Sequence, residues 1–235
     1  TPGGIVATTT ATSTNFTGLT NGVSYHFAVT ATNAIGTSAT TTSLSPIIPR
    51  DPALFGYEYS SQIGTKGTSE VSNDGELYQP RRVITDPLGN IYIVDTYNNR
   101  VQKFDTNGNF ILKFGTNGNL DGELFTPVGI SLDSAGNIFI ADSNNSRIQK
   151  FNSSGVYISQ FGINGSANGE LTSPNAVFVD KLSNDDIYVA DTQNHRVQKF
   201  SSSTSYISQF GTLGSGDGQM NQPKDIIRNG SYLYV

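Results

Sequence analysis

The chain of 235 residues contains no cysteine and only two histidines, His26 and His195. The absence of cysteine excludes disulfide bonds, thiolate zinc sites and a cysteine nucleophile. Two histidines are too few for a three-histidine metal cage. No apolar run approaches the roughly 20 residues of a membrane-spanning helix. These absences remove several classes of metalloenzyme, thiol enzyme and disulfide-stabilised domain from consideration.

Charged residues are also scarce, at 14% of the chain, and the formal net charge is -5. Hydrophobic residues make up 35%, and there are 25 glycines. Glycine, threonine, serine and asparagine fill the remaining positions, a composition typical of strands and turns rather than helices. We therefore expect an all-β protein.

The composition changes sharply after the first 50 residues, which hold fourteen threonines and a single charged residue, Arg50. The rest of the chain carries all nineteen acidic residues and a net charge of -6. Three prolines between positions 46 and 52 favour an extended connection. The predicted organisation is a first domain over 1–46, a proline-rich linker over 47–53 and a second domain over 54–235.

The first domain shows strict alternation of apolar and polar residues from Val23 to Ala31, which predicts a half-buried antiparallel strand. Turn sequences, Asn21-Gly22 and Asn33-Ala34-Ile35-Gly36, stand on either side. With Tyr25 in the tyrosine-corner position, this stretch resembles the C-terminal half of a fibronectin type III domain. Such a sandwich needs about 100 residues, so we expect its first strands to precede Thr1.

The second domain consists of repeats. The string from Gly89 to Phe104 returns at 136–151 and at 185–200, with periods of 47 and 49 residues. The two extra residues fall in one turn between Asp180 and Ile187, where an insertion is tolerated at little cost. Each repeat predicts four short strands whose polarity rises from the first to the fourth. This gradient is typical of a β-propeller blade, with inner strands covered on both faces and the outer edge in water.

The repeats resemble NHL repeats, whose signature is carried by the residues from Tyr188 to Phe200. The resemblance implies an NHL-type propeller of four-stranded blades, incomplete in this chain. The expected parts are a closure strand at 57–64, blades at 80–116, 127–163 and 174–212, and a partial blade at 223–235. We therefore expect further blades of this propeller to lie outside the given sequence.

Residues that recur in every blade meet a structural need that all blades share, and we interpret them as structural. The clearest are an aspartate and an arginine five residues apart, which flank the loop between the second and third strands. They are Asp95 and Arg100, Asp142 and Arg147, and Asp191 and Arg196. We expect each to form a bidentate pair that fixes the loop; the alternative is an acidic ring that binds a cation. No motif specifies a metal or cofactor, although calcium stays open.

Binding should depend on positions that differ between blades, in the loops between the second and third strands and just after each proline. The candidate ligand-binding residues are Arg81, Arg82, Tyr97, Asn98, Asn144, Gln193, Lys224 and Asp225. Two adjacent guanidiniums suit a carboxylate or phosphate, and the alternative is that they are solvated or paired between blades. His195 stands where the NHL signature commonly has histidine, so we expect it to be scaffold.

These observations favour a non-catalytic binding or structural module of a secreted or cell-surface protein, with a bacterial or archaeal origin expected. The expected ligand is a protein or a glycan, and no catalytic residue is assigned. One alternative is a metal-dependent propeller lyase or hydrolase whose catalytic residues lie partly in other blades. A second is RNA binding, as in tripartite-motif NHL proteins, which the charge of -6 disfavours.

Overall fold

The computed structural model describes residues 26, 28–30, 32–33, 36–38, 41–42, 62–67 and 73–235. The chain divides into two compact units, Thr1–Ser61 and Gln62–Val235. In the first unit, β1 (Ala28–Val29) pairs antiparallel with β4 (Thr41–Thr42), and β2 (Thr32–Asn33) with β3 (Gly36–Thr37). These short pairings do not test the fibronectin resemblance, which stays a prediction. The linker at 47–53 and most of the closure strand at 57–64 lie outside the described residues.

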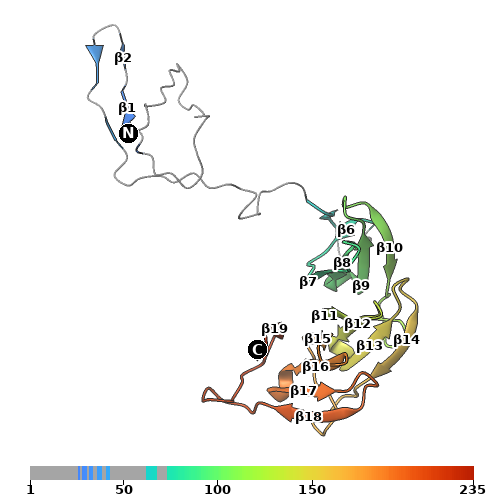
Figure 1. The fold of residues 1–235 in the computed structure, drawn as a ribbon. Coiled ribbons are helices and arrows are strands. Elements are labelled where there is room, and N and C mark those ends of the chain that lie inside the picture. The colour runs from blue at the N-terminus through green and yellow to red at the C-terminus, as the bar shows by residue number, and fades with distance from the viewer. Residues whose placement is uncertain are drawn as a thin grey trace. The chain divides into compact units, whose positions relative to one another are not determined.

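The second unit is built mainly from four-stranded antiparallel sheets in which neighbouring strands are consecutive in the sequence (Figure 1). The first sheet contains β7 (Arg82–Thr85), β8 (Ile91–Asp95), β9 (Arg100–Phe104) and β10 (Phe110–Phe114). The second contains β11 (Pro127–Leu132), β12 (Ile138–Asp142), β13 (Arg147–Phe151) and β14 (Tyr157–Phe161). The third contains β15 (Ala176–Asp180), β16 (Asp186–Asp191), β17 (Arg196–Phe200) and β18 (Tyr206–Phe210). A hairpin of β19 (Ile227–Asn229) and β20 (Tyr232–Tyr234) follows.

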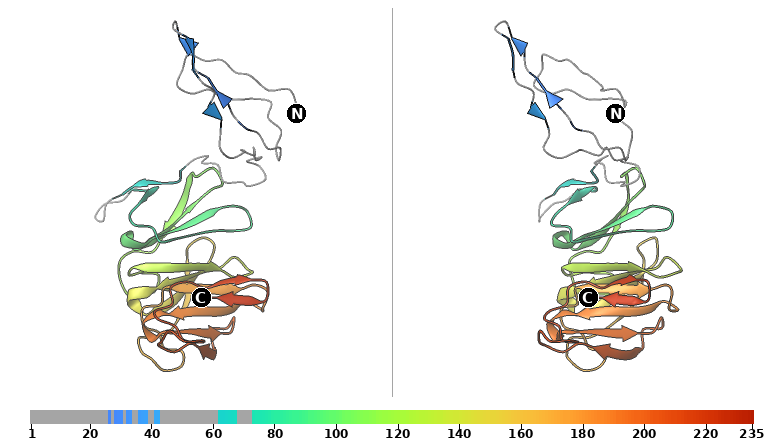
Figure 2. Two further views of the ribbon diagram at one scale, coloured as in Figure 1. Left: turned by 90° about the vertical axis from the view of Figure 1, so that its left-hand side faces the viewer. Right: turned by 60° about the vertical axis from the view of Figure 1, so that its left-hand side comes forward.

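The sheets follow one another in chain order around an unclosed arc, with β7, β11, β15 and β19 on its inner side and β10, β14 and β18 at its rim (Figures 1 and 2). This arrangement confirms the predicted fold class, an all-β propeller with four-stranded blades, which is unclosed over the described residues. No helix in the described part of the chain is long and apolar enough to cross a membrane.

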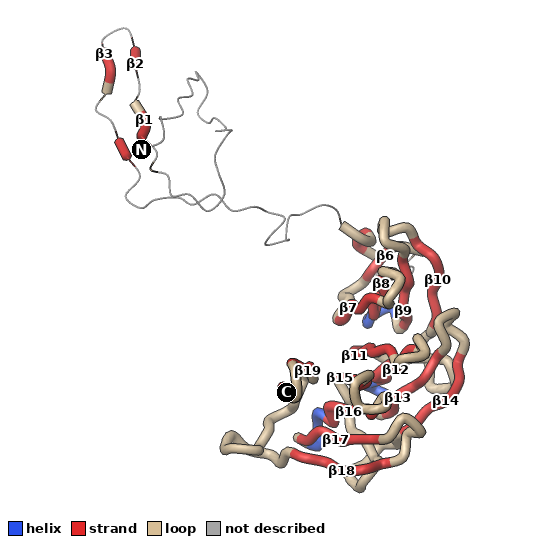
Figure 3. The backbone as a smooth tube through the Cα atoms, in the orientation of Figure 1, coloured by secondary structure: helices blue, strands red, loops and turns tan. Residues whose placement is uncertain are grey.

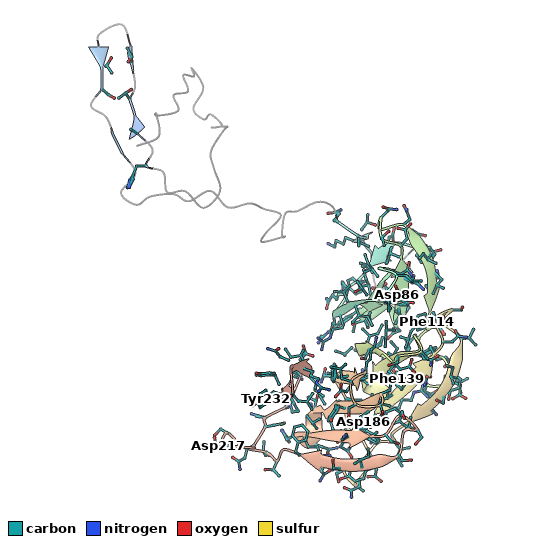
Figure 4. The ribbon with its side chains drawn as sticks, viewed as in Figure 1. Asp86, Phe114, Phe139, Asp186, Asp217 and Tyr232 are labelled. Atoms are coloured by element: carbon teal, nitrogen blue, oxygen red, sulfur yellow. The ribbon has the colours of Figure 1, made fainter. Side chains whose placement is uncertain are left out.

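The core lies between neighbouring blades, which explains why the second strand of a blade has no polar face. In β12, Ile138 and Ile140 pack in a cluster shared with the first blade, whereas Phe139 and Ala141 pack in one shared with the third. Phe114, labelled with Phe139 in Figure 4, belongs to the first of these clusters. Burying such a side chain contributes roughly 1.5–3 kcal/mol. A blade therefore gains its stability from its neighbours.

The outer strands touch the next blade through a glycine turn. A Cβ on Gly155, whose φ is +79°, would lie 2.8 Å from the Phe114 side chain of the preceding blade. One blade earlier, a Cβ on Gly108 would lie 3.2 Å from Ile63. Ile63 therefore occupies the place that Phe114 takes at the end of its outer strand, although residues 62–64 are not assigned as a strand.

The segments that join blades share one local conformation. Before the first blade, β5 (Thr65–Lys66) pairs in parallel with β6 (Glu76–Leu77). The corresponding segments of later blades carry single parallel bridges. These bridges are Asn117 to Leu124, Asn164 to Leu171, and Leu213 to Met220. The segment that precedes each blade therefore contains the same parallel backbone bridge.

Candidate binding face

The predicted ligand-binding residues lie at one end of the inner strands, which we call the loop end. It comprises the short 3-10 turns η1 (Thr96–Asn98), η2 (Ser143–Asn145) and η3 (Thr192–Asn194), shown in blue in Figure 3, and the segments that join blades. Pro127, which starts the inner strand of the second blade, pairs with Asp142 at the start of the η2 loop. The opposite end, where turns join the first and second strands, we call the turn end.

A buried carboxylate organises the loop end of every complete blade. In the second blade, Asp142 is fully buried. Its Oδ2 accepts hydrogen bonds from Arg147 Nε at 2.7 Å, Asn145 Nδ2 at 2.9 Å and Gln149 Nε2 at 3.1 Å. Its Oδ1 accepts the Phe125 backbone N–H at 2.7 Å. Asp95 and Asp191 are held in the same way in the first and third blades.

The recurring aspartate–arginine ion pair is present in all three blades, with arginine Nε 2.7–2.8 Å from aspartate Oδ2. The expected bidentate geometry is not what the second blade shows. Only Nε of Arg147 reaches Asp142, because Nη1 and Nη2 donate to backbone carbonyls of the preceding segment. These carbonyls belong to Asn119, Leu120 and Glu123. The arginine therefore ties the loop to the entering chain and satisfies partly buried backbone acceptors that a forked pair would leave without this donor.

The cation-binding alternative has no open ligand in this network. Each recurring carboxylate is fully buried and enclosed by protein donors. Within the residues that the structure describes, no group of three or more histidine, cysteine, aspartate or glutamate side chains is arranged to hold a metal ion. The arrangement serves to fix a loop.

Asn98 belongs to this scaffold and not to the variable set in which the sequence analysis placed it. Its Nδ2 donates to Asp95 Oδ2 at 2.9 Å, as Asn145 and Asn194 do to their own aspartates. The signal was available in the sequence, because an asparagine stands three residues after the aspartate in every blade.

A second link joins each loop to the following blade, and the sequence analysis missed it. The residue after each 3-10 turn has a left-handed backbone, with φ of 52° at Asn99, 55° at Ser146 and 56° at His195. Asn99 Oδ1 accepts the backbone N–H of Thr126 at 2.8 Å, and His195 Nδ1 accepts that of Gln222 at 3.1 Å. This contact gives His195 the scaffold role expected of it. The missed signal is the left-handed position itself, which asparagine tolerates well.

The structure brings together Arg82 and Asp225, which are far apart in the sequence. Arg82 Nη1 donates to Asp225 Oδ2 at 2.7 Å, and Nη2 donates to Oδ1. Burial acts to raise the pKa of the Asp225 carboxyl, but the hydrogen bond and charge of Arg82 outweigh it and hold that pKa below its usual value. At the equivalent places, the second and third inner strands carry Gly129 and Ala176. Arg82 is therefore engaged in a pair between blades, one of the two alternatives left open.

The other candidates remain at the surface of the loop end. Tyr97 is 44% exposed, and its ring meets the Tyr78 ring edge-on at 5.6 Å. Asn144 Nδ2 donates to Thr126 Oγ1 at 3.0 Å, and Gln193 Oε1 accepts from Gln222 Nε2 at 3.4 Å; both residues are exposed. Arg81 and Lys224 are exposed and form no ion pair within the described residues. The loop end thus presents an aromatic ring, two amides and two cations.

Comparison with known proteins identifies the repeats. The NHL repeat model matches residues 77–104, 126–151 and 172–200. The chain therefore carries three NHL repeats in a propeller-like fold. No curated protein matches the chain significantly.

Several solved structures are similar in part. A virginiamycin B lyase from Staphylococcus aureus matches 79% of this chain at 13% identity, with a TM-score of 0.47. A hydrazine synthase from Kuenenia stuttgartiensis matches 73% of this chain at 11% identity, with a TM-score of 0.49. A streptogramin B lyase matches 56% of this chain at 18% identity, with a TM-score of 0.44. The chain spans 48%, 42% and 39% of the length of these proteins, respectively.

Proposed function

We propose that this propeller is a non-catalytic binding module whose loop end recognises a protein partner outside the cell. One observation carries the proposal: exposed, blade-specific side chains stand on the η1–η3 loops, which a buried, repeated hydrogen-bond network holds in place, and on the residues that follow Pro80 and Pro223. These side chains are Arg81, Tyr97, Asn144, Gln193 and Lys224. A surface whose loops are ordered before binding loses little conformational entropy on association, and functional residues are often carried on loops by a rigid scaffold.

The chemistry of this face favours a partner that presents carboxylates. Arg81 and Lys224 are the sequence neighbours of Arg82 and Asp225, which form a neutral ion pair. Arg81 and Lys224 themselves form no ion pair in the described region, so this part of the loop end carries two uncompensated cations. Tyr97 adds a large ring at low entropic cost. Tyrosine and arginine are enriched among the residues that dominate protein interfaces. We therefore expect an acidic protein segment next to an apolar side chain.

The test is a selection of peptides from a displayed random library on the immobilised chain. The selected peptides are then measured by titration against Arg81→Ala, Tyr97→Ala and Lys224→Ala. Loss of a central contact should weaken binding about five- to tenfold, with an unchanged melting temperature because the three side chains are exposed. Lys113→Ala, on the outer strand β10, is the matched control.

Two results would overturn the proposal. If all three substitutions leave peptide affinity untouched, the loop end is not the binding face. If a glycan array gives selective binding that these substitutions abolish while no peptide is selected, the face is correct but the ligand is a sugar.

A further inference from the structure

The turn end of the inner strands holds a cavity of about 340 Å³. Ile84, Leu132, Phe178 and Leu182 supply most of its apolar wall, from three successive blades. Polar groups reach it from Asp180, Lys181 and Arg228, the last on β19. The size lies at the lower end of the range for small-molecule sites, roughly 300–1,000 Å³, and the combination of apolar walls with a few polar groups is typical of them.

The only change of length among the three complete repeats falls at this cavity. The turn from Asp180 to Ile187 is two residues longer than the corresponding turn of the second blade, and its Lys181 and Leu182 line the cavity. The turn is anchored to its neighbour, because Ser134 donates to Asp185 Oδ1 through its backbone N–H at 3.1 Å and its Oγ at 2.8 Å. The insertion therefore has a fixed conformation.

The longer turn also changes which carboxylate pairs with the lysine of the third strand. In the second blade, Lys150 Nζ lies 3.0 Å from Oδ2 of Asp133, the residue that directly follows the inner strand. In the third blade, Lys199 Nζ lies 2.7 Å from Oδ2 of Asp186 instead. Asp180, the equivalent of Asp133, is thereby left to accept a hydrogen bond from Arg228.

Arg228 is itself a departure from the repeat. The equivalent position of the second and third inner strands holds Leu132 and Val179, so an arginine at the cavity is specific to β19. Asp180 pairs with Arg228, so among the charged residues that line the cavity the charge of Lys181 remains unbalanced. Lys181 is exposed and forms no ion pair among the residues that the structure describes.

We propose that this cavity binds a small monoanion with an apolar body, such as an aromatic carboxylate. The ring would lie against Leu132, Phe178 and Leu182, and the carboxylate would pair with Lys181 at the mouth. This site is independent of the proposed protein-binding face, because it lies at the opposite end of the inner strands.

The experiment uses 1-naphthoate and its neutral isostere 1-naphthamide, each titrated into the full chain. Binding is followed by the fluorescence of the naphthyl ring, because the chain has no tryptophan whose emission would overlap it. We expect naphthoate to bind the more tightly. Lys181→Gln should weaken naphthoate about three- to fivefold, the worth of an exposed ion pair, and leave naphthamide unchanged. Leu182→Ala should weaken both probes equally. Lys113→Gln makes the same charge change far from the cavity and should alter neither.

The proposal fails if neither probe binds at millimolar concentration, or if both bind equally and Lys181→Gln has no effect. It also fails if Lys113→Gln weakens naphthoate as much as Lys181→Gln does, because the attraction would then be a general effect of charge. All the substituted residues are exposed, so loss of folding is not expected to obscure the result.

Discussion

The two ends of the inner strands follow different rules. At the loop end, the same aspartate, asparagine, arginine and glutamine make the same hydrogen bonds in three blades. At the turn end, turn length, lysine partner and inner-strand residue all change in the third and fourth repeats. The reason is mechanical: the loop end must join each blade to its neighbours, whereas a turn joins two strands of one blade and accepts insertions cheaply. Residues that are the same in every blade hold the loops in place, whereas residues that depart from the repeat show where a ligand site can develop.

The comparison is tested most severely by removing one aspartate from each end of the second blade. Asp142→Ala, at the loop end, leaves the buried Arg147 charge unpaired and should lower the free energy of unfolding by about 3–5 kcal/mol. Asp133→Ala, at the turn end, removes hydrogen bonds within one turn and the partly exposed ion pair with Lys150, and should cost about 1–3 kcal/mol. Urea denaturation of both variants measures the difference. Equal losses would show that the loop end has no special structural weight.

Acid titration of Asp133 tests the turn end separately. Burial acts to raise the pKa of Asp133, but hydrogen bonds from Asn137 and the ammonium of Lys150 outweigh it and hold that pKa below its usual value. A lowered folded-state pKa contributes stability above the unfolded pKa of about 3.9, and that contribution is lost as the pH falls through the folded value. Asp133→Asn should therefore lose less stability than the parent chain between about pH 5 and about pH 3, as followed by the urea midpoint. An identical acid response in both proteins would contradict the assignment.

The smallest expected effect concerns the forward link at His195. His195→Ala removes the acceptor for the Gln222 N–H and should cost about 1 kcal/mol. His195→Asn should cost almost nothing, because Asn99 fills the same left-handed position in the first blade and accepts the equivalent bond at 2.8 Å. Thermal unfolding of the two variants checks the pair. If asparagine is as damaging as alanine, the link depends on the imidazole itself.

The sequence predicted the features that repetition makes visible. The blade strands followed from the repeat and from the rise in polarity from the first strand to the fourth, and the pairing of Asp142 with Arg147 followed from their constant spacing. The rest of the network was less accessible, because the bonds from Arg147 to backbone carbonyls depend on how the entering segment folds. Asn98 was visible as a recurring residue but was grouped with the variable ones.

Long-range contacts were out of reach of local patterns. Arg82 and Asp225 are 143 residues apart, and only the curvature of the blades around a shared axis brings them into contact. The cavity was missed for a different reason. The insertion after Asp180 was interpreted as a tolerated surface change, and its effect on the Lys199 partner requires knowledge of side-chain positions.

The links at the loop end run in both directions along the chain. Arg147 holds the segment that arrives from the blade before, and Ser146, the residue next to it, accepts from the blade after at 3.5 Å. Under tension applied at the two ends of the Gln62–Val235 unit, we expect the load to pass through these bonds in series, so that the force on one blade also strains its neighbours.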